Sequence, residues 1–360
     1  MPSVSVMLKP ASSLCNMRCE YCFYHSLAGQ RSAPSHGMMS GDTLKNVIEK
    51  AFAYADGAPV SLSFQGGEPL LAGKDFFRLA EELLRTLNVK RSPVSVGVQT
   101  NGTLLDDEWC DMFTRFGWLV GLSLDGDRNH NAMRVFEDGT PSFDAAYSAA
   151  KLMEKHRTPF NILAVLTRPV AENIERVYAF FRRNKFRHLQ FIPVLRPLGG
   201  EEAKEDDGVS LTPAAYLNFL KKAFSLYMKD MIDGRYTSIR QFDNFVLLAG
   251  FKRAEQCGMN GECTRQFVVE GDGAVYPCDF YCLDEYLAGN INESSFEELA
   301  ESPVTVKFLE EGSVLPEKCD GCKYLRMCNG GCKRERIDID KCEAYTEFFD
   351  YALPHLKRMS

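Results

Sequence analysis

The chain has 360 residues, 45% of them hydrophobic and 25% charged, which is enough for one large domain or two ordinary ones. Its 42 Lys and Arg against 49 Asp and Glu give a net charge of −7, which argues against a general binder of nucleic acid or membrane surfaces. No apolar run approaches the roughly 20 residues that span a bilayer, and the N-terminus lacks a secretion signal, so we expect a cytoplasmic protein.

Short apolar, β-branched runs alternate with helical patterns over the first two thirds of the chain. The predicted strands are 4–9, 60–65, 94–99, 119–124, 160–166 and 188–194, and their near-continuous apolar character predicts burial on both faces. The predicted helices are about 42–56, 74–88, 106–116, 142–157 and 171–184, with Asp106 and Ser142 as expected N-caps. This alternation implies a parallel sheet with right-handed crossovers. Six strand–helix units fall short of the eight of a closed barrel, so we expect an open, partial (β/α)6 barrel of the TIM type.

The pattern changes after about residue 235. A long helix is predicted at about 212–232, and residues 267–280 contain two strand-like runs around a Gly-Asp-Gly turn, which indicates a hairpin. Nine of the 13 cysteines follow residue 256, and a last helix is predicted at about 343–357. We therefore divide the chain into an α/β domain, 1–235, and a small cysteine-rich domain, 236–360.

Three cysteines, Cys15, Cys19 and Cys22, follow the first predicted strand with C-x3-C-x2-C spacing. The carboxyl ends of parallel strands are where α/β folds carry out chemistry. Thiolates bind zinc or iron–sulfur clusters, and a reducing cytosol disfavours disulfides. Three ligands would leave one iron of a cubane [4Fe–4S] cluster open, as in catalytic metal sites. The alternative is a zinc site with a distant fourth ligand such as His25.

This loop, with an aromatic residue before its last cysteine, resembles the cluster motif of radical S-adenosylmethionine (SAM) enzymes. In that superfamily SAM chelates the free iron, and its reductive cleavage releases a 5′-deoxyadenosyl radical. A partial barrel is the superfamily's fold. GGEP at 66–69 resembles its GGE motif, where glycines permit close backbone approach and the carboxylate is able to accept from an ammonium. Read alone, GGEP is equally well a simple turn.

The resemblance also implies which residues contact SAM. They are Tyr21, Gly67, Ser123, Arg134 and Leu195. Arg134 lies in a divergent loop, where a solvated surface arginine is the alternative.

Eight cysteines of the tail form an ordered pattern that two tetrathiolate clusters would account for. The pattern resembles the SPASM extension, which holds two auxiliary [4Fe–4S] clusters; two structural zinc sites are the alternative. By this resemblance the ligands are Cys257, Cys263, Cys278 and Cys332 for the first cluster and Cys319, Cys322, Cys328 and Cys342 for the second. Cys110 is expected to be a small core residue. Cys282 competes with Cys278 for the first cluster, and we prefer Cys278 because it matches the family position.

At a finer level nearly the whole chain resembles the anaerobic sulfatase-maturating enzymes, most specifically in CGMNG (257–261) and YPCDFY (276–281). These enzymes oxidise a Cys or Ser in a sulfatase's Cys/Ser-x-Pro-x-Arg segment to Cα-formylglycine without oxygen. The resemblance implies a sulfatase polypeptide as substrate, with three [4Fe–4S] clusters and SAM as cofactors. It also implies a low-potential electron donor such as ferredoxin or flavodoxin. No nucleic-acid or membrane partner is expected.

The reaction requires a base, because a radical at the substrate Cβ must lose one proton and one electron to give a thioaldehyde or aldehyde. Asp279 adjoins Cys278, so base and electron acceptor would lie together, and in the family this aspartate is the proposed proton acceptor. The alternative is a capping or turn aspartate. Tyr24 and Gln65 match family positions that line the substrate, with simple packing at the barrel mouth as their alternative.

Other functions stay open on sequence grounds. Another radical SAM peptide modification, such as thioether formation or epimerisation, is less favoured because no leader-peptide-binding domain precedes the barrel. A non-catalytic iron–sulfur electron carrier would leave GGEP and the barrel unexplained. A zinc-bound scaffold protein would contain no iron.

Overall fold

The structure, a computed structural model, describes residues 2–198 and 207–360. The chain forms two compact units, each built from separated segments. The first unit comprises Met1–Leu122, Arg134–Phe160 and Arg265–Phe308, and the second comprises Ser123–Met133, Asn161–Thr264 and Leu309–Ser360. The division at residue 235 follows sequence modules rather than compactness, and it stays a prediction.

The sheet of the first unit has the strand order β10-β9-β8-β1-β2-β3-β4. Its strands are β1 (Val4–Leu8), β2 (Val60–Phe64), β3 (Val94–Thr100), β4 (Leu119–Ser123), β8 (Phe267–Val269), β9 (Ala274–Tyr276) and β10 (Gly289–Asn290). Strands β1 to β4 are parallel, and β8 joins the other edge of β1 in parallel. Strands β8 and β9 are antiparallel, which confirms the predicted hairpin.

The strands of the first unit are less buried than expected. In β1 the buried residues Val4, Val6 and Leu8 alternate with an exposed and a half-buried one, and β2 repeats the pattern. The reason lies in the serines at alternate positions, Ser5 and Ser61, which point to the other face of the sheet. The prediction that both faces are covered is therefore wrong for these two strands.

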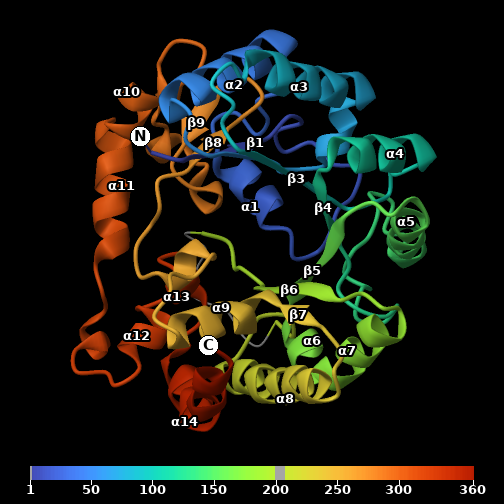
Figure 1. The fold of residues 1–360 in the computed structure, drawn as a ribbon, viewed down its shortest axis with the longest axis vertical. Helices are drawn as coiled ribbons and strands as arrows, with labels where there is room; N and C mark the ends of the chain where they lie inside the picture. Colours follow the sequence, from blue (N-terminus) through green and yellow to red (C-terminus); the bar gives the residue numbers. More distant parts are fainter. Residues whose placement is uncertain (1, 199–206) are drawn as a thin grey trace. The chain divides into compact units, whose positions relative to one another are not determined.

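Helices of the first unit follow its parallel strands, and Figure 1 shows α2 and α3 side by side. The helical elements are α1 (Phe23–Gln30), α2 (Gly41–Ala55), η1 (Pro69–Ala72), α3 (Lys74–Leu87), α4 (Asp107–Phe116), α5 (Phe143–His156), η3 (Asp279–Tyr281), η4 (Asp284–Tyr286) and α10 (Phe296–Ala300). Asp106 caps α4 by accepting from the Trp109 backbone N–H, as predicted. Ser142 occupies the predicted N-cap position of α5 but makes no side-chain capping hydrogen bond, and its hydroxyl donates to the Arg134 carbonyl at 2.8 Å.

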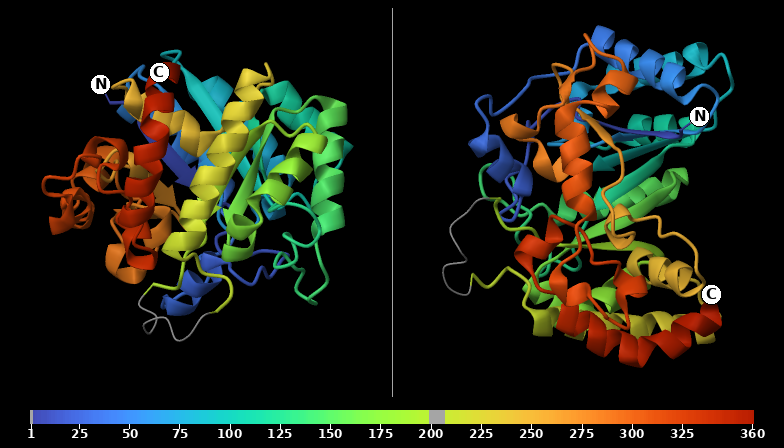
Figure 2. Two further views of the ribbon diagram at one scale, coloured as in Figure 1. Left: turned by 90° about the horizontal axis from the view of Figure 1, so that it is seen from below. Right: turned by 90° about the vertical axis from the view of Figure 1, so that its left-hand side faces the viewer.

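The second unit contains the parallel strands β5 (Phe160–Leu166), β6 (His188–Pro193) and β7 (Ser238–Ile239). Its helical elements are α6 (Arg168–Glu172), α7 (Ile174–Arg183), α8 (Pro213–Ile232), α9 (Arg240–Ala249), η2 (Cys257–Met259), η5 (Glu317–Cys319), α12 (Leu325–Cys328), α13 (Glu335–Asp338) and α14 (Cys342–Met359), while α11 (Pro303–Ser313) belongs to both units. Figure 2 shows α8 and α14 side by side, where Phe224 and Phe348 meet edge to face. Both long helices agree with the prediction.

Candidate active site

The first group of predicted ligands lies on the loop between β1 and α1. Cys15, Cys19 and Cys22 follow the carboxyl end of β1, where the sequence placed them. The loop is ordered around its sulfur atoms, since the Met17 N–H donates to Cys15 Sγ at 3.4 Å and the Cys22 N–H donates to the Cys19 carbonyl at 3.1 Å.

The thiols of this loop lie close enough to influence one another. The pKa of Cys15 is raised to about 12, mainly by burial, and Glu68 and the neighbouring thiols of Cys19 and Cys22 act in the same direction. Thiolates crowded into a buried site are stabilised by a bound cation or cluster, which takes up their charge. The residues present therefore fit an iron–sulfur cluster, and the assignment of these three cysteines as its ligands stays a prediction.

The GGEP segment supports this cysteine loop directly. The Gly67 N–H donates to the Ser12 carbonyl and the Glu68 N–H to the Leu14 carbonyl, both at 2.8 Å. A Cβ at Gly67 would lie only 2.0 Å from the Leu14 carbonyl oxygen. Gly66 has φ +114°, in the left-handed region that favours glycine. The glycines thus permit the close approach of two backbones, and a SAM contact of Gly67 stays a prediction.

We expect Gly67→Ala to displace the cysteine loop and to remove about one cluster's share of iron from the protein, because the new methyl group meets backbone atoms that have no free space. Gly29→Ala is the matched control, since a Cβ there meets nothing within 4 Å. Iron per chain and SAM cleavage measure the effect. Full iron content with normal cleavage in Gly67→Ala would refute this support role.

Glu68, which follows the two glycines, is a fully buried carboxyl group. Its oxygens accept from the Thr100 hydroxyl and the Asn101 N–H, both at 2.8 Å, and from the Leu70 N–H at 3.1 Å. Burial raises the pKa of Glu68 to about 7. Glu68 caps η1, so the alternative interpretation of GGEP as a turn holds in part. A turn alone, however, does not require a buried carboxylate.

Three of the five predicted SAM contacts lie in the first unit, and two of these three touch. Arg134 Nη1 donates to the Tyr21 hydroxyl at 3.0 Å. Arg134 is buried, so it is not a solvated surface arginine. Ser142 fixes the backbone of the same loop. Ser123, the last residue of β4, and Leu195, two residues beyond β6, belong to the second unit.

Asp279 lies together with both predicted substrate residues. The Tyr24 hydroxyl donates to Asp279 Oδ2 at 2.6 Å, and Gln65 Nε2 lies 2.9 Å from the Tyr24 oxygen and 3.3 Å from the same Oδ2. Asp279 is the first residue of η3, but its carboxylate contacts side chains from distant segments rather than its own turn. A base requires such a defined orientation.

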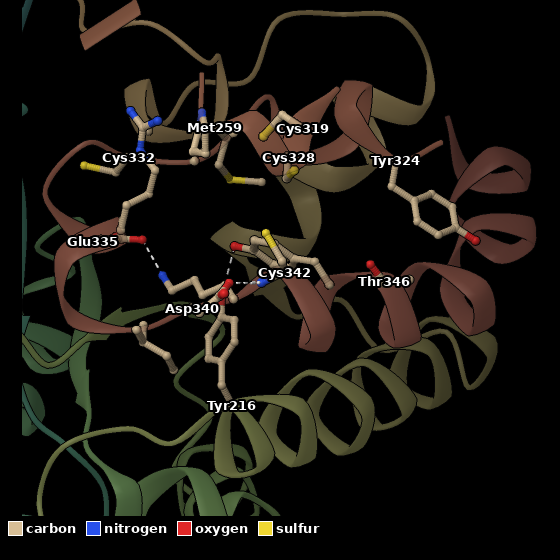
Figure 3. Close-up of a pocket in the computed structure, with 18 of the residues that line it drawn as sticks. Tyr216, Met259, Cys319, Tyr324, Cys328, Cys332, Glu335, Asp340, Cys342 and Thr346 are labelled. Atoms are coloured by element: carbon tan, nitrogen blue, oxygen red, sulfur yellow. Dashed lines mark hydrogen bonds and ion pairs between the residues drawn. The ribbon is translucent and has the colours of Figure 1, made fainter. Parts of the chain in front are cut away.

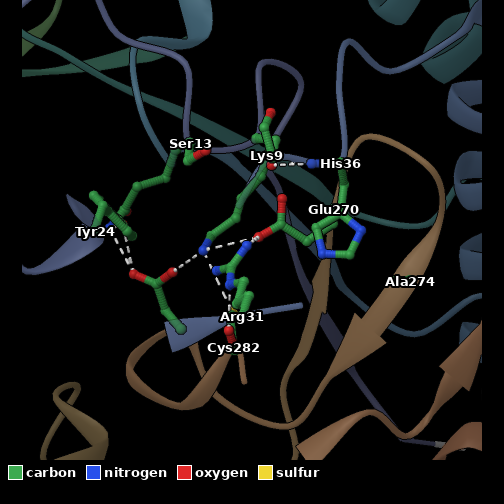
Figure 4. A network of polar contacts seen from close by, with 12 residues as sticks. Lys9, Ser13, Tyr24, Arg31, His36, Glu270, Ala274 and Cys282 are labelled. Atoms are coloured by element: carbon green, nitrogen blue, oxygen red, sulfur yellow. Dashed lines mark hydrogen bonds and ion pairs between the residues drawn. The ribbon is translucent and has the colours of Figure 1, made fainter. Parts of the chain in front are cut away.

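Sequence reasoning missed a group of charged residues next to this aspartate, among them Lys9, Arg31 and Glu270 (Figure 4). Lys9 Nζ lies 3.0 Å from Asp279 Oδ1 and 3.4 Å from Glu270 Oε1, and Arg31 Nη1 lies 2.8 Å from the same Glu270 oxygen. Burial lowers the pKa of Lys9, but Asp279, Cys282 and Glu270 together raise it by more, so it stands above its ordinary value. The sequence pattern that could have revealed two of them is a charged residue directly after an apolar strand: Lys9 in VMLK and Glu270 in FVVE.

The two remaining cysteines of uncertain role are both fully buried. Cys110 lies in α4, as expected of a core residue. Cys282 packs against Val268 and Tyr276, and its sulfur accepts from Lys9 Nζ at 3.3 Å. These contacts agree with the preference for Cys278 as a cluster ligand.

Seven of the eight predicted auxiliary ligands lie in the second unit, and Cys278 lies in the first. A cavity of about 390 Å³ is lined by Cys319, Cys322, Cys328, Cys332 and Cys342 (Figure 3). Burial raises the pKa of Cys328, and the thiols of Cys319, Cys322 and Cys342 act in the same direction. The four cysteines predicted for the second auxiliary cluster are thus neighbours around one cavity.

The other set is partly assembled within the second unit. Burial raises the pKa of Cys332 to about 11, with a contribution from Cys257, and the Cys257 thiol also raises the pKa of Cys263. Among the described residues no three His, Cys, Asp or Glu side chains form a group suited to a single metal ion. The assignment of each cysteine to a cluster stays a prediction.

Comparisons with known proteins identify the family. A model of the radical SAM superfamily matches residues 10–181, and a SPASM model, described as an iron–sulfur cluster-binding domain, matches residues 257–323. The chain is 42% identical to the cysteine-type anaerobic sulfatase-maturating enzyme of Clostridium perfringens strain 13, over 99% of this chain and 98% of that protein. The chain belongs to the anaerobic sulfatase-maturating enzymes.

Other members of these maturating enzymes give the same result. The serine-type enzyme of Bacteroides thetaiotaomicron is 30% identical, over 98% of this chain and 90% of that protein. A solved structure described as native anSMEcpe with bound AdoMet and Cp18Cys peptide matches with a TM-score of 0.93 at 40% identity, over 99% and 98% of the two chains. This match confirms the predicted fold class, a radical SAM partial barrel with a SPASM extension.

Membership confirms the predicted activity. The chain is a radical SAM oxidoreductase that converts a Cys or Ser side chain of a sulfatase polypeptide to Cα-formylglycine, with SAM and three [4Fe–4S] clusters as cofactors. None of the described helices combines the length and apolar character that crossing a membrane requires.

Proposed function

We propose that this maturating enzyme is of the cysteine type, and that its natural target is the Cys of a Cys-x-Pro-x-Arg segment. The observation that carries the proposal is the 42% identity to the cysteine-type enzyme of C. perfringens, against 30% to the serine-type enzyme of B. thetaiotaomicron. A solved relative described with a bound Cp18Cys peptide is 40% identical over nearly the whole chain, which agrees with this assignment.

In this proposal the loop after β1 binds the catalytic cluster. Cys15, Cys19 and Cys22 are its ligands, and the SAM contacts are Tyr21, Gly67, Ser123, Arg134 and Leu195. The hydrogen bond between Arg134 and Tyr21 supports their roles, and the packing of Gly67 places it beside the cysteine loop. The auxiliary ligands are Cys257, Cys263, Cys278 and Cys332 for one cluster and Cys319, Cys322, Cys328 and Cys342 for the other. When bound, these groups supply a radical that abstracts a hydrogen atom and an acceptor for one electron.

The chain's own residues then handle the proton. After the Cβ–H bond of the target cysteine is broken, its S–H bond breaks, the Cβ=S bond forms, and one proton and one electron leave. Asp279 Oδ2 receives this proton, while Tyr24 and Gln65, which contact the same oxygen, orient the carboxylate and line the substrate. Water finally replaces sulfur, which gives the aldehyde and hydrogen sulfide.

The setting of the enzyme follows from its chemistry. None of the 13 cysteines, all of which lie within the described residues, forms a disulfide, which supports a reducing cytoplasm. Ferredoxin or flavodoxin is the proposed low-potential donor. The matches at 10–181 and 257–323 support a radical SAM domain over 1–235 and a SPASM domain over 236–360.

We expect SAM to bind more weakly as the pH falls, because the pKa of Glu68 is about 7 and only its ionised carboxylate attracts the ammonium group of SAM. Between about pH 8 and about pH 6 the Kd should rise about tenfold, as the carboxylate becomes protonated. Glu68→Gln should bind weakly with a flat profile, while Glu82→Gln, an exposed control on α3, should keep the slope. A pH-independent Kd in the unchanged protein would contradict this role of Glu68.

Competition between two peptides tests the cysteine-type proposal. The reduced, cluster-replete protein receives SAM and equal amounts of Cys-x-Pro-x-Arg and Ser-x-Pro-x-Arg peptides, and both products are followed by mass. We expect faster formation of formylglycine from the cysteine peptide. Faster conversion of the serine peptide would replace the proposal with a serine-type assignment.

A further inference from the structure

Four charged side chains of the first unit form what we name the buried ion cluster: Lys9, Arg31, Glu270 and Asp279 (Figure 4). They come from the end of β1, the residue after α1, the end of β8 and the start of η3. Lys9 is 1% exposed and Glu270 is 0% exposed. Burial of isolated charges is costly, so such a cluster persists only when its charges are paired and hydrogen-bonded.

The charges of the buried ion cluster balance, with two cations and two carboxylates. Arg31 pairs with Glu270, since its Nη1 donates to Glu270 Oε1 at 2.8 Å. Its Nε donates to the Cys282 carbonyl at 2.5 Å. Lys9 joins the two carboxylates, and its ammonium lies closer to Asp279 than to Glu270, at 3.0 Å against 3.4 Å. Lys9 is thus the member that connects the cluster to the proposed base.

The two oxygens of Asp279 have different surroundings. Oδ1 faces the Lys9 ammonium, whereas Oδ2 accepts from the Tyr24 hydroxyl and lies within 3.3 Å of Gln65. Lys9 Nζ also lies 4.7 Å from the centre of the Tyr24 ring, so the same cation contacts both the aspartate and its donor. Lys9 thus pairs with Oδ1, and Oδ2 is the oxygen that contacts both predicted substrate residues.

We propose that Lys9 is a positioning residue that holds Asp279 Oδ1 and thereby presents Oδ2 to the S–H group of the substrate; this inference rests on the proposed role of Asp279 as the base. Lys9 does not touch the reacting atoms. It fixes the rotation of the carboxylate, so that each abstraction of a hydrogen atom from Cβ is followed by transfer of the S–H proton to Oδ2. Without Lys9, SAM is still cleaved but the substrate radical is converted to product less often.

A purely structural role makes a different prediction. If Lys9 only balances buried charge between the sheet and the hairpin, removal of one negative charge along with it should restore the enzyme. Lys9→Met with Glu270→Gln does this, because Arg31 and Asp279 then remain as one cation and one carboxylate. The double variant restores charge balance but not the contact to Asp279.

The test measures formylglycine formed per 5′-deoxyadenosine in four proteins: unchanged, Lys9→Met, Glu270→Gln and the double variant. A Cys-x-Pro-x-Arg peptide deuterated at Cβ reports hydrogen abstraction as deuterium in 5′-deoxyadenosine. We expect the ratio of formylglycine to 5′-deoxyadenosine to fall about tenfold or more in both proteins that lack Lys9. This loss is smaller than the loss caused by removal of a general base. Deuterium transfer should persist in all four, and Glu270→Gln should keep its ratio.

Each other outcome overturns the inference. A normal ratio in Lys9→Met, or a ratio restored in the double variant, shows that Lys9 only balances charge. Asp279→Asn, measured alongside, separates this failure from that of the proposed function, since a normal ratio there removes Asp279 as the base. If neither variant without Lys9 binds its clusters, Lys9→Arg decides by the same ratio. Arginine keeps the charge but moves the donors, so an unchanged ratio refutes positioning.

Discussion

Cys15→Ala is expected to abolish cleavage of SAM by the reduced protein. The loop after β1 offers three thiols, and without Cys15 only Cys19 and Cys22 remain to hold a cluster that already relies on SAM for its fourth position. The Met17 N–H and the Asn101 side-chain amide contact Cys15 Sγ as hydrogen-bond donors. Neither group is able to replace the lost sulfur as a cluster ligand. The measurement is 5′-deoxyadenosine formed by the reconstituted variant under dithionite.

Cys110→Ala is the matched control for this experiment. Cys110 is a buried thiol of the same unit, but it packs inside α4 and is expected only to lower stability slightly. The control should therefore retain its iron and its cleavage of SAM. Cleavage retained by Cys15→Ala would contradict the assignment of the first cluster.

Asp279→Asn is expected to separate the two halves of the reaction. The amide keeps the size of the side chain and an oxygen for the Tyr24 hydroxyl, but it cannot accept a proton at neutral pH. SAM cleavage should stay near normal, while formylglycine should fall at least about a hundredfold, the lower range for loss of a general base. The products are 5′-deoxyadenosine and the modified peptide, both measured by mass.

A nearby carboxylate controls for charge alone. Asp284 is exposed, lies five residues further on in η4 and accepts from the Ser32 N–H. Asp284→Asn should leave both products unchanged. A normal formylglycine yield from Asp279→Asn would remove this aspartate as the base, and the contact with Tyr24 would then be structural.

Local patterns predicted the parts of the site that follow one another in the chain. The cysteine loop after β1, the GGEP turn after β2 and the hairpin before Cys278 all lie where the sequence placed them. In each case a few adjacent residues determine the result, because strand ends and turns depend on local chemistry. The ligand sets of the auxiliary clusters came from resemblance, since spacing alone does not pair eight thiols.

The sequence did not predict which side chains from distant parts of the chain come into contact. Lys9 and Glu270 are 261 positions apart, and Tyr24 and Asp279 are 255 apart, so only the folded chain brings them together. The hydrogen bond of Ser142 was missed for a related reason, because its hydroxyl donates to the Arg134 carbonyl rather than capping α5. The close approach of the GGEP glycines to the cysteine loop was also not predicted, and their approach to SAM stays a prediction.

Radical oxidation at Cβ of the target cysteine is tested by following one hydrogen atom. The reduced, cluster-replete protein is incubated without oxygen with SAM and a Cys-x-Pro-x-Arg peptide deuterated at Cβ. We expect one deuterium in 5′-deoxyadenosine and conversion of the same cysteine to formylglycine, in matching amounts. Formylglycine without deuterium transfer, or 5′-deoxyadenosine without any change in the peptide, would contradict this mechanism.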